Sequence, residues 1–303
     1  MEFFKTNTTI PFMKQRNWAA IFSITLFLFS VISLTIHGLN LGLDFTGGTQ
    51  IEATFNKAAD VTYIRNALKQ AGFNEAVVQQ YGSNKDVLIR IGLQKKKEEE
   101  LRKQFQEILP DANLQQIQYI GPQVGKKLAT NGILAILVSI ILIMLYVAMR
   151  FEYRFAVSAT VALIHDPILI LGVFSFFHLE FNLIVLAAVL TILGYSLNDT
   201  IVVYDRVREN FRKVRKGTTI EIMDLSINQT LSRTIMTSGL TLLVVIALYL
   251  FGGEMLRGFS LALIIGIAVG TYSSIYVAGS FAVFMGLERK HLLPAAKPTD
   301  DMP

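Results

Sequence analysis

The sequence predicts an α-helical membrane protein with six transmembrane helices and one α+β domain outside the membrane. Apolar residues make up 52% of its 303 residues. They gather in blocks of about 20, the length that crosses about 30 Å of hydrocarbon. One stretch, residues 37–125, lacks such a block and carries ten acidic and ten basic side chains, as a soluble domain does. These patterns define the fold class before any motif is considered.

Six apolar blocks are long enough to be transmembrane helices. The first is too long for the core of a cleaved signal peptide, and no small-residue cleavage site follows it, so we expect it to persist as a helix. The blocks are Trp18–Ile36, Leu128–Met149, Phe155–Phe177, Phe181–Tyr204, Ile235–Phe251 and Phe259–Leu287.

Basic residues flank these blocks asymmetrically, which predicts their orientation. Lys and Arg gather before the first block, between the second and third, after the fourth and after the sixth. These positions fall on one side if the helices alternate, and the positive-inside rule makes that side cytoplasmic. The predicted organisation is a cytoplasmic N-terminus (1–17), a first transmembrane helix (18–36), an outer domain (37–127), helices two to six (128–287) with a cytoplasmic loop (205–234), and a cytoplasmic tail (288–303).

Charge and composition argue against several classes of function. The outer segment is neutral, so the whole excess behind the net charge of +5 lies beside apolar blocks. That pattern reflects membrane topology and does not indicate nucleic acid binding. The chain has no Cys and its four His are far apart in the sequence, so we expect no disulfide, metal or other cofactor. No nucleophile–base arrangement or complete phosphate loop is visible, so we do not expect an enzyme.

The outer segment shows the alternation of strands and helices expected of a ferredoxin-like domain. Gln50–Phe55 alternates apolar and polar residues, as a half-buried strand does. Asp60 can cap a helix that stops near Gly72. The remaining predicted elements are strands at Glu75–Tyr81 and Val87–Gly92 around a turn at 83–86, an amphipathic helix at Lys95–Leu109, and a strand at Asn113–Ile120. The resulting order is β-α-β-β-α-β.

Polar side chains in or beside the predicted spans are the candidates for function, because a charge at the bilayer centre costs about 2.5–3.5 kcal/mol. A buried carboxylate near an arginine can take up and release a proton as its surroundings change. The proton-relay candidates are His165, Asp166, Asn198, Asp199, Asp205, Arg233 and Thr237.

Each of these candidates also has a structural interpretation. Asp199 and Arg233 could form a fixed ion pair that holds two helices together, and the pattern alone does not choose between relay and packing. His165 and Asp166 are adjacent, so their side chains point about 100° apart on a helix, which favours a structural role. Asp205 fits a solvated helix end.

The last span carries a different pattern, a ridge of small residues. Small residues let helix backbones approach closely, so we expect Gly266, Gly270 and Ser274 to serve helix packing. A four-residue ridge drifts about 40° per step, so it must meet more than one neighbour. The ridge consists of Gly258, Ala262, Gly266, Gly270, Ser274, Ala278, Ala282 and Gly286.

Two motifs give the chain a resemblance to a known family. Leu43–Thr49 contains Asp44, Phe45, Gly47 and Gly48 in the order Leu-Asp-Phe-Thr-Gly-Gly-Thr. Gly194–Arg206 reads Gly-Tyr-Ser-Leu-Asn-Asp-Thr-Ile-Val-Val-Tyr-Asp-Arg. The first string resembles a signature of the SecD/SecF protein-export membrane subunits, and the second resembles the fourth-span signature of the SecF branch. The segments Asn228–Thr234 and Phe251–Gly253 also fit, and no position of these motifs departs from the pattern.

The resemblance implies a function and a set of partners. Members resemble the resistance–nodulation–division (RND) transporters, and SecD and SecF pair one-to-one so that two six-helix halves form a twelve-helix unit. That unit works in the bacterial inner membrane beside the SecYEG channel and accessory subunits of the YajC and YidC type. It uses the proton-motive force to promote late steps in the translocation of unfolded preproteins. The resemblance makes the outer domain periplasmic and favours Asp199 and Arg233 as proton-path residues.

Two other functions stay open at this point. One is half of an RND-type small-molecule efflux transporter, although six spans and one small outer domain leave little room for a substrate cavity. The other is a passive membrane scaffold of the translocase, against which the polar groups at membrane depth argue.

Overall fold

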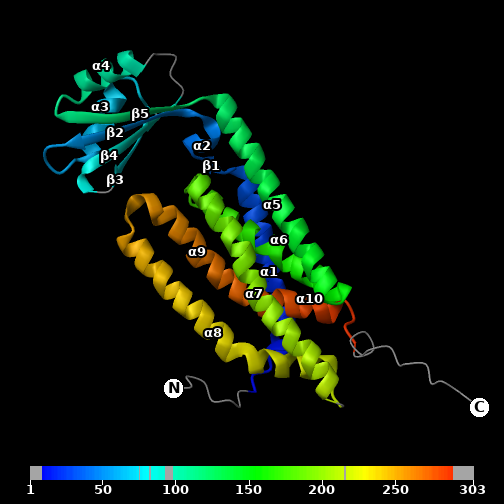
Figure 1. Ribbon diagram of the computed structural model, residues 1–303. Helices are drawn as coiled ribbons and strands as arrows, with labels where there is room; N and C mark the ends of the chain where they lie inside the picture. Colours follow the sequence, from blue (N-terminus) through cyan, green and yellow to red (C-terminus); the bar gives the residue numbers. More distant parts are fainter. Residues whose placement is uncertain (1–8, 75, 82, 93–97, 215, 289–303) are drawn as a thin grey trace, which may run out of the picture.

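The computed structural model describes residues 9–288 except residues 75, 82, 93–97 and 215. Residues 1–8 of the expected N-terminal segment and 289–303 of the expected tail lie outside the described residues. A bundle of long helices carries a small α+β domain at one end (Figure 1). Six helices of the described chain are long and apolar enough to cross a membrane, as predicted.

The six candidate spans occupy most of the chain. The sixth is divided by a five-residue π-helix, η2. The spans are α1 (Arg16–Ile36, preceded by the 3₁₀ turn η1, Phe12–Gln15), α5 (Pro122–Arg150), α6 (Tyr153–Phe176), α7 (Leu183–Lys213), α8 (Thr219–Phe251), and α9 (Gly253–Ser273) with η2 (Ser274–Ala278) and α10 (Gly279–Phe284).

Three helix boundaries differ clearly from the prediction. The expected loop at 205–234 is wrong, because α7 continues to Lys213 and α8 already begins at Thr219. Thr218 and Glu221 form a capping box that satisfies the first N–H groups of α8. The hydropathy of the sequence shows where contact with lipid ends, but it does not show where a helix ends. These helices continue beyond that level with polar residues. For the same reason α5 begins at Pro122, before the apolar block.

The α+β domain has the predicted ferredoxin-like fold. Its sheet order is β3-β4-β2-β5, with every neighbouring pair antiparallel. The N-cap of α3 is Asp60, whose side chain accepts hydrogen bonds from two backbone N–H groups. The elements are β2 (Gly48–Phe55), α3 (Val61–Gln70), β3 (Val77–Tyr81), β4 (Ser83–Ile91), α4 (Glu98–Ile108) and β5 (Ala112–Ile120).

The predicted turn at 83–86 lies inside strand β4, which corrects the sequence interpretation. The polar residues there are compatible with a strand because they lie at its exposed end. Asp86 accepts hydrogen bonds from the hydroxyls of Ser83 (2.6 Å) and Thr54 (2.7 Å), which ties β4 to the neighbouring strand β2. The exposed end of this strand therefore has the same polar composition as a turn, which explains the wrong prediction.

A short two-stranded sheet and one helical turn join the domain to the bundle. Strand β1 (Asn40–Leu41) pairs in parallel with β6 (Glu180–Phe181), just before α7. The turn α2 (Leu43–Thr46) follows and packs on α5. A Cβ on Gly125 of α5 would lie 2.7 Å from the carbonyl oxygen of Phe45, so only glycine allows this approach. The chain leaves α2 through Gly47, whose φ of +75° also favours glycine.

Helices α6, α7 and α9 form the buried centre of the bundle, while α1, α5 and α8 expose most of their surface. Ridge residues from Ala262 to Ala282 are buried, in accord with the expected packing role. A Cβ on Gly266 would overlap the side chain of Ile192, and one on Gly270 would lie 3.0 Å from Cβ of Ser196. The ridge of α9 therefore packs directly on α7.

The π-helix η2 explains how the ridge stays buried beyond Ser274. In an α-helix each four-residue step turns slightly more than a full circle, so the ridge drifts. A π-helix has more than four residues per turn, because its hydrogen bonds join residues five apart. The drift is therefore reversed across η2 (Ser274–Ala278), and Ala278 and Ala282 remain inside.

Candidate functional site

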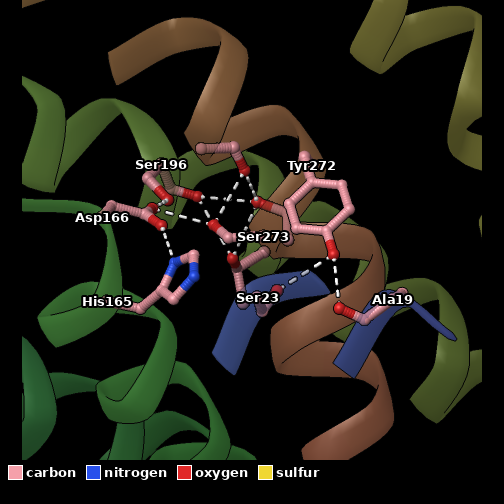
Figure 2. A network of polar contacts seen from close by, with 10 residues as sticks. Ala19, Ser23, His165, Asp166, Ser196, Tyr272 and Ser273 are labelled. Carbon is pink, nitrogen blue, oxygen red and sulfur yellow. Dashed lines mark hydrogen bonds and ion pairs between the residues drawn. The ribbon is translucent and has the colours of Figure 1, made fainter. Parts of the chain in front are cut away.

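Asp166 of α6 lies at the centre of a buried network of hydrogen bonds. Only 1% of its surface is exposed. Its Oδ1 lies 3.0 Å from Nδ1 of His165, and its Oδ2 accepts hydrogen bonds from the hydroxyls of Ser196 (2.6 Å) and Ser273 (2.8 Å). Figure 2 shows these side chains converging from α6, α7 and α9. An ionised carboxylate accepts all three bonds when the His165 proton is on Nδ1.

The backbone around this carboxylate is irregular on two sides. Pro167 follows Asp166 inside α6 and has no N–H to donate to the carbonyl of Leu163. On the facing segment, Ser273 directly precedes the π-helix η2. π-Turns occur frequently at functional sites. The network therefore joins two helices at the point where each departs from regular α geometry.

Asp199 of α7 is a second buried carboxylate, with 3% of its surface exposed. Its Oδ2 accepts a hydrogen bond from the hydroxyl of Ser238 on α8 at 3.2 Å. Ser238 in turn accepts one from Thr271 of α9 at 2.9 Å. Among the residues that the structure describes, no arginine or lysine forms an ion pair with Asp199 or with Asp166. Hydroxyl groups therefore provide most of the polar surroundings of both carboxylates.

The other predicted relay residues form no hydrogen bond with these two carboxylates, although the charge of Arg233 acts on Asp199. Arg233 and Asn198 are exposed on the outside of the isolated chain, and the Arg233 guanidinium makes no hydrogen bond or ion pair within the described ranges. Thr237 donates to the carbonyl of Arg233 in its own helix. Asp205 forms an ion pair with Arg150 at 3.0 Å, with both side chains nearly half exposed, as a solvated helix end would.

Sequence reasoning missed the connection between His165 and Asp166 and both serine ligands of Asp166. The helical angle between adjacent residues does not exclude a contact, because the imidazole ring can turn toward the next side chain. Ser196 stands inside the Gly194–Arg206 string, and Ser273 borders the small-residue ridge. The signal that could have found these two partners was the presence of serines on segments that pack closely against the third span.

The glycine motif after α1 holds the α+β domain against the start of α7. Oδ2 of Asp44 accepts a hydrogen bond from the backbone N–H of Leu183 at 2.9 Å, so the carboxylate caps α7. Phe45 stacks on Phe181 with ring centroids 5.8 Å apart. Arg90 of β4 forms an ion pair with Glu180, just before α7. The motif therefore has a structural explanation that does not involve a ligand.

Comparison with known proteins identifies the class to which this fold and polar network belong. Residues 100–288 match the family described as "Protein export membrane protein SecD/SecF, C-terminal", and residues 32–59 match the "SecD/SecF GG Motif". The chain belongs to the SecD/SecF family of protein-export membrane proteins. Its relatives include protein translocase subunit SecF of Vibrio alginolyticus, 51% identical over 96% of this chain and 94% of that protein.

Further matches narrow the position of the chain within the family. The SecF subunit of Pseudomonas aeruginosa is 46% identical over 97% of this chain and 98% of its own length. The crystal structure of SecDF from Thermus thermophilus has a TM-score of 0.82 and 37% identity, and covers 93% of this chain. This chain spans only 39% of that SecDF chain. It is therefore a membrane subunit of the SecF type, which serves protein export in the bacterial inner membrane.

Proposed function

We propose that the chain is the SecF half of a SecD–SecF unit that uses the proton-motive force to promote late steps of preprotein translocation. Asp199 and Asp166 are its proton-binding groups. The observation that carries the proposal is that Asp199 and Asp166 are buried in adjacent membrane helices among hydroxyls, and that no arginine or lysine of the described residues forms an ion pair with either. A charge buried at Asp199 is costly, so a change of hydration or of a nearby charge switches the protonation of this carboxylate.

The attachment of the domain to α7 supports coupling between the membrane and the outer domain. Ser196 and Asp199 lie on the same helix whose first turn is capped by Asp44. A shift or rotation of α7 on protonation is therefore transmitted to the α+β domain. A shift of α7 moves the α+β domain only if the contacts between them are rigid. The ion pair between Arg90 of the domain and Glu180, just before α7, therefore serves the same coupling.

An exposed face on α7 and α8 supports pairing with a SecD chain. Asn198 and Arg233 are polar residues on this face, and they would be unfavourable against lipid. Leu243, Val244 and Phe251 of α8 are 65%, 69% and 85% exposed. This chain matches only 39% of the SecDF chain. The rest of that chain therefore contains a second part, which this chain lacks. A SecD partner would cover this face and bring Arg233 into a protein environment.

The remaining partners follow from family membership. The SecD–SecF unit would work beside the SecYEG channel, with accessory subunits of the YajC and YidC type, on unfolded preproteins. The basic residues that flank the spans support a topology with both termini in the cytoplasm and the α+β domain in the periplasm.

Proton-driven export can be tested by removing the titrating group without changing its shape. We expect Asp199→Asn to fold and to pair with SecD but to lose the export gain that a proton gradient produces. Asp199→Glu should keep part of it. Translocation into vesicles with and without a gradient measures the effect. Glu209→Gln, on the exposed end of the same helix, is the matched control. If Asp199→Asn and the control respond alike to the gradient, the chain is a passive scaffold at this position.

The orientation can be tested with single cysteines, because the chain has none of its own. Asn84→Cys, at the exposed start of strand β4, should react with a membrane-impermeant thiol reagent added to the periplasmic side of intact cells. Lys216→Cys, between α7 and α8, is the control and should react only after the membrane is opened. The reversed labelling pattern would overturn the predicted topology.

A further inference from the structure

A groove on the bundle surface extends along α1 and is closed by α6, η2 and α10. Its volume is about 790 Å³, within the range of sites that hold small molecules. It lies apart from the exposed face of α7 and α8 that we assign to SecD, since no residue of α7 or α8 lines it. Its outer rim includes Ile24 and Leu28, which are 58% and 53% exposed and lie in a candidate membrane span.

One end of the groove is polar and lies at the start of α1. Arg16 and Asn17 line it, and the Arg16 side chain forms no hydrogen bond or ion pair with any residue that the structure describes. Ser280 of α10 lines the same groove, and its buried hydroxyl has no hydrogen-bond partner within the described ranges. Trp18 beside this end is 77% exposed, as expected of a tryptophan at a membrane interface. A cation and an unused hydroxyl therefore face the groove near the headgroup level.

The rest of the groove is apolar and reaches into the bilayer. Val161 and Ile164 of α6 and Phe27 of α1 line this part. From Arg16 to Leu28 the helix rises about 18 Å at about 1.5 Å per residue. Half of the hydrocarbon core is about 15 Å thick, so the groove spans about one leaflet.

We propose that this groove binds one anionic glycerophospholipid, with its phosphate at Arg16 and Ser280 and one acyl chain along α1. The alternative occupant is a transmembrane helix of another protein. The cation at Arg16 favours the lipid, because a phosphate at the headgroup level supplies the charge partner that Arg16 lacks among the described residues.

The bound acyl chain would also affect the buried network at Asp166. The ring of His165 forms part of the groove wall, and its buried Nε2 has no hydrogen-bond partner among the described residues. The ring stacks on Phe27 with centroids 6.4 Å apart. An acyl chain in the deep part of the groove would pack against this wall and help hold the His165 ring in place beside Asp166.

The test is lipid binding by the purified full chain, measured by native mass spectrometry. Phosphatidylglycerol and phosphatidylethanolamine with identical acyl chains are titrated in turn, which separates headgroup charge from apolar contact. We expect one phosphatidylglycerol to bind in preference. Arg16→Gln should weaken its binding about fivefold, the effect of one basic residue near an anionic membrane surface. Ala20→Phe, which fills the groove, should abolish it.

Two control variants outside the groove show whether the effects of the groove variants are specific. Arg208→Gln removes a cation outside the groove, and Ala148→Phe adds a ring on an exposed part of α5. Both should bind phosphatidylglycerol as the wild type does. Thermal unfolding in detergent without lipid checks that the groove variants fold, and added phosphatidylglycerol should raise the unfolding temperature of the wild type but not of Ala20→Phe.

Two outcomes would overturn the proposal. Equal binding by the wild type, Arg16→Gln and Ala20→Phe would mean that bound lipid is an adventitious additive only. A photoreactive residue at Ile24 in native membranes should form crosslinks to lipid; a crosslink to another polypeptide would show that a protein occupies the groove. Neither measurement depends on export activity, so failure here leaves the proposed function untouched.

Discussion

Replacing Gly172 by alanine should separate two transmembrane helices at one point. Gly172 of α6 faces Ser30 of α1, and a Cβ on Gly172 would lie 2.7 Å from Cα of Ser30 and closer still to its side chain. Because the nearest atoms include backbone, the two helices must move apart. Overpacking of this kind costs about 1–3 kcal/mol, and a backbone clash belongs at the upper end, so we expect a loss of about 3 kcal/mol.

A glycine in open space provides the control for this experiment. A Cβ on Gly239 of α8 would meet nothing within 4 Å. Gly239→Ala should therefore stabilise its helix, by up to about 1 kcal/mol from helix propensity. Ser30→Gly combined with Gly172→Ala removes the side-chain part of the clash and should recover part of the loss.

Unfolding of the purified chain by sodium dodecyl sulfate, followed by circular dichroism, measures all three variants. The order of stability should be Gly239→Ala, wild type, the Ser30→Gly/Gly172→Ala double variant, and Gly172→Ala. Identical unfolding midpoints for Gly172→Ala and Gly239→Ala would refute the close contact between α1 and α6.

Two further predictions concern the α+β domain and its attachment. Asp44→Ala removes the acceptor of the Leu183 N–H, while the N-cap residue Asn182 keeps its bond to Val185. It should destabilise the chain by about 0.5–2 kcal/mol, with faster hydrogen exchange in the first turn of α7 than in the Asp111→Asn control. Hydrogen bonds from Ser83 and then Thr54 lower the pKa of Asp86. The stability they provide is present above the unfolded-state pKa, about 3.9, and is lost as pH falls through the lower folded-state pKa. Thermal unfolding between pH 3 and 6 should therefore depend less on pH in Asp86→Asn; an unchanged pH dependence would contradict the assignment.

The sequence was sufficient to predict the six spans and the ferredoxin-like order, since both depend on patterns that repeat along the chain. Boundaries were predicted less well. Polar residues at 205–213 continue a helix, and those at 83–86 begin a strand. Most of these side chains are at least partly exposed, and solvent exposure gives helices, strands and loops similar polar compositions.

The buried carboxylates of the candidate site were predicted from the sequence, but the residues to which they are hydrogen-bonded were not. Asp199 and Asp166 were found because carboxylates inside apolar blocks are conspicuous. Their partners Ser238, Ser196 and Ser273 were not identified, because serine is common in membrane helices and becomes informative only when the packing of α6, α7, α8 and α9 is known. Arg233 was expected beside Asp199, and its charge does act on that carboxylate. It forms no ion pair with Asp199, however, and lies on an outer face where a second chain can reach it.

The π-helix between α9 and α10 also decides where this chain can change in length. A π-turn contains one residue more than the α-turn it replaces. Deleting one residue within Ser274–Ala278 would let the backbone return to α geometry without breaking the helix. The residues after the deletion would keep nearly the same direction relative to the bundle, because the wider π-turn already winds back by about the 100° that one α residue adds. Ala282 would therefore stay in the interior. A single-residue deletion should be tolerated better here than inside the regular buried helices α6 and α7, where it would rotate everything that follows.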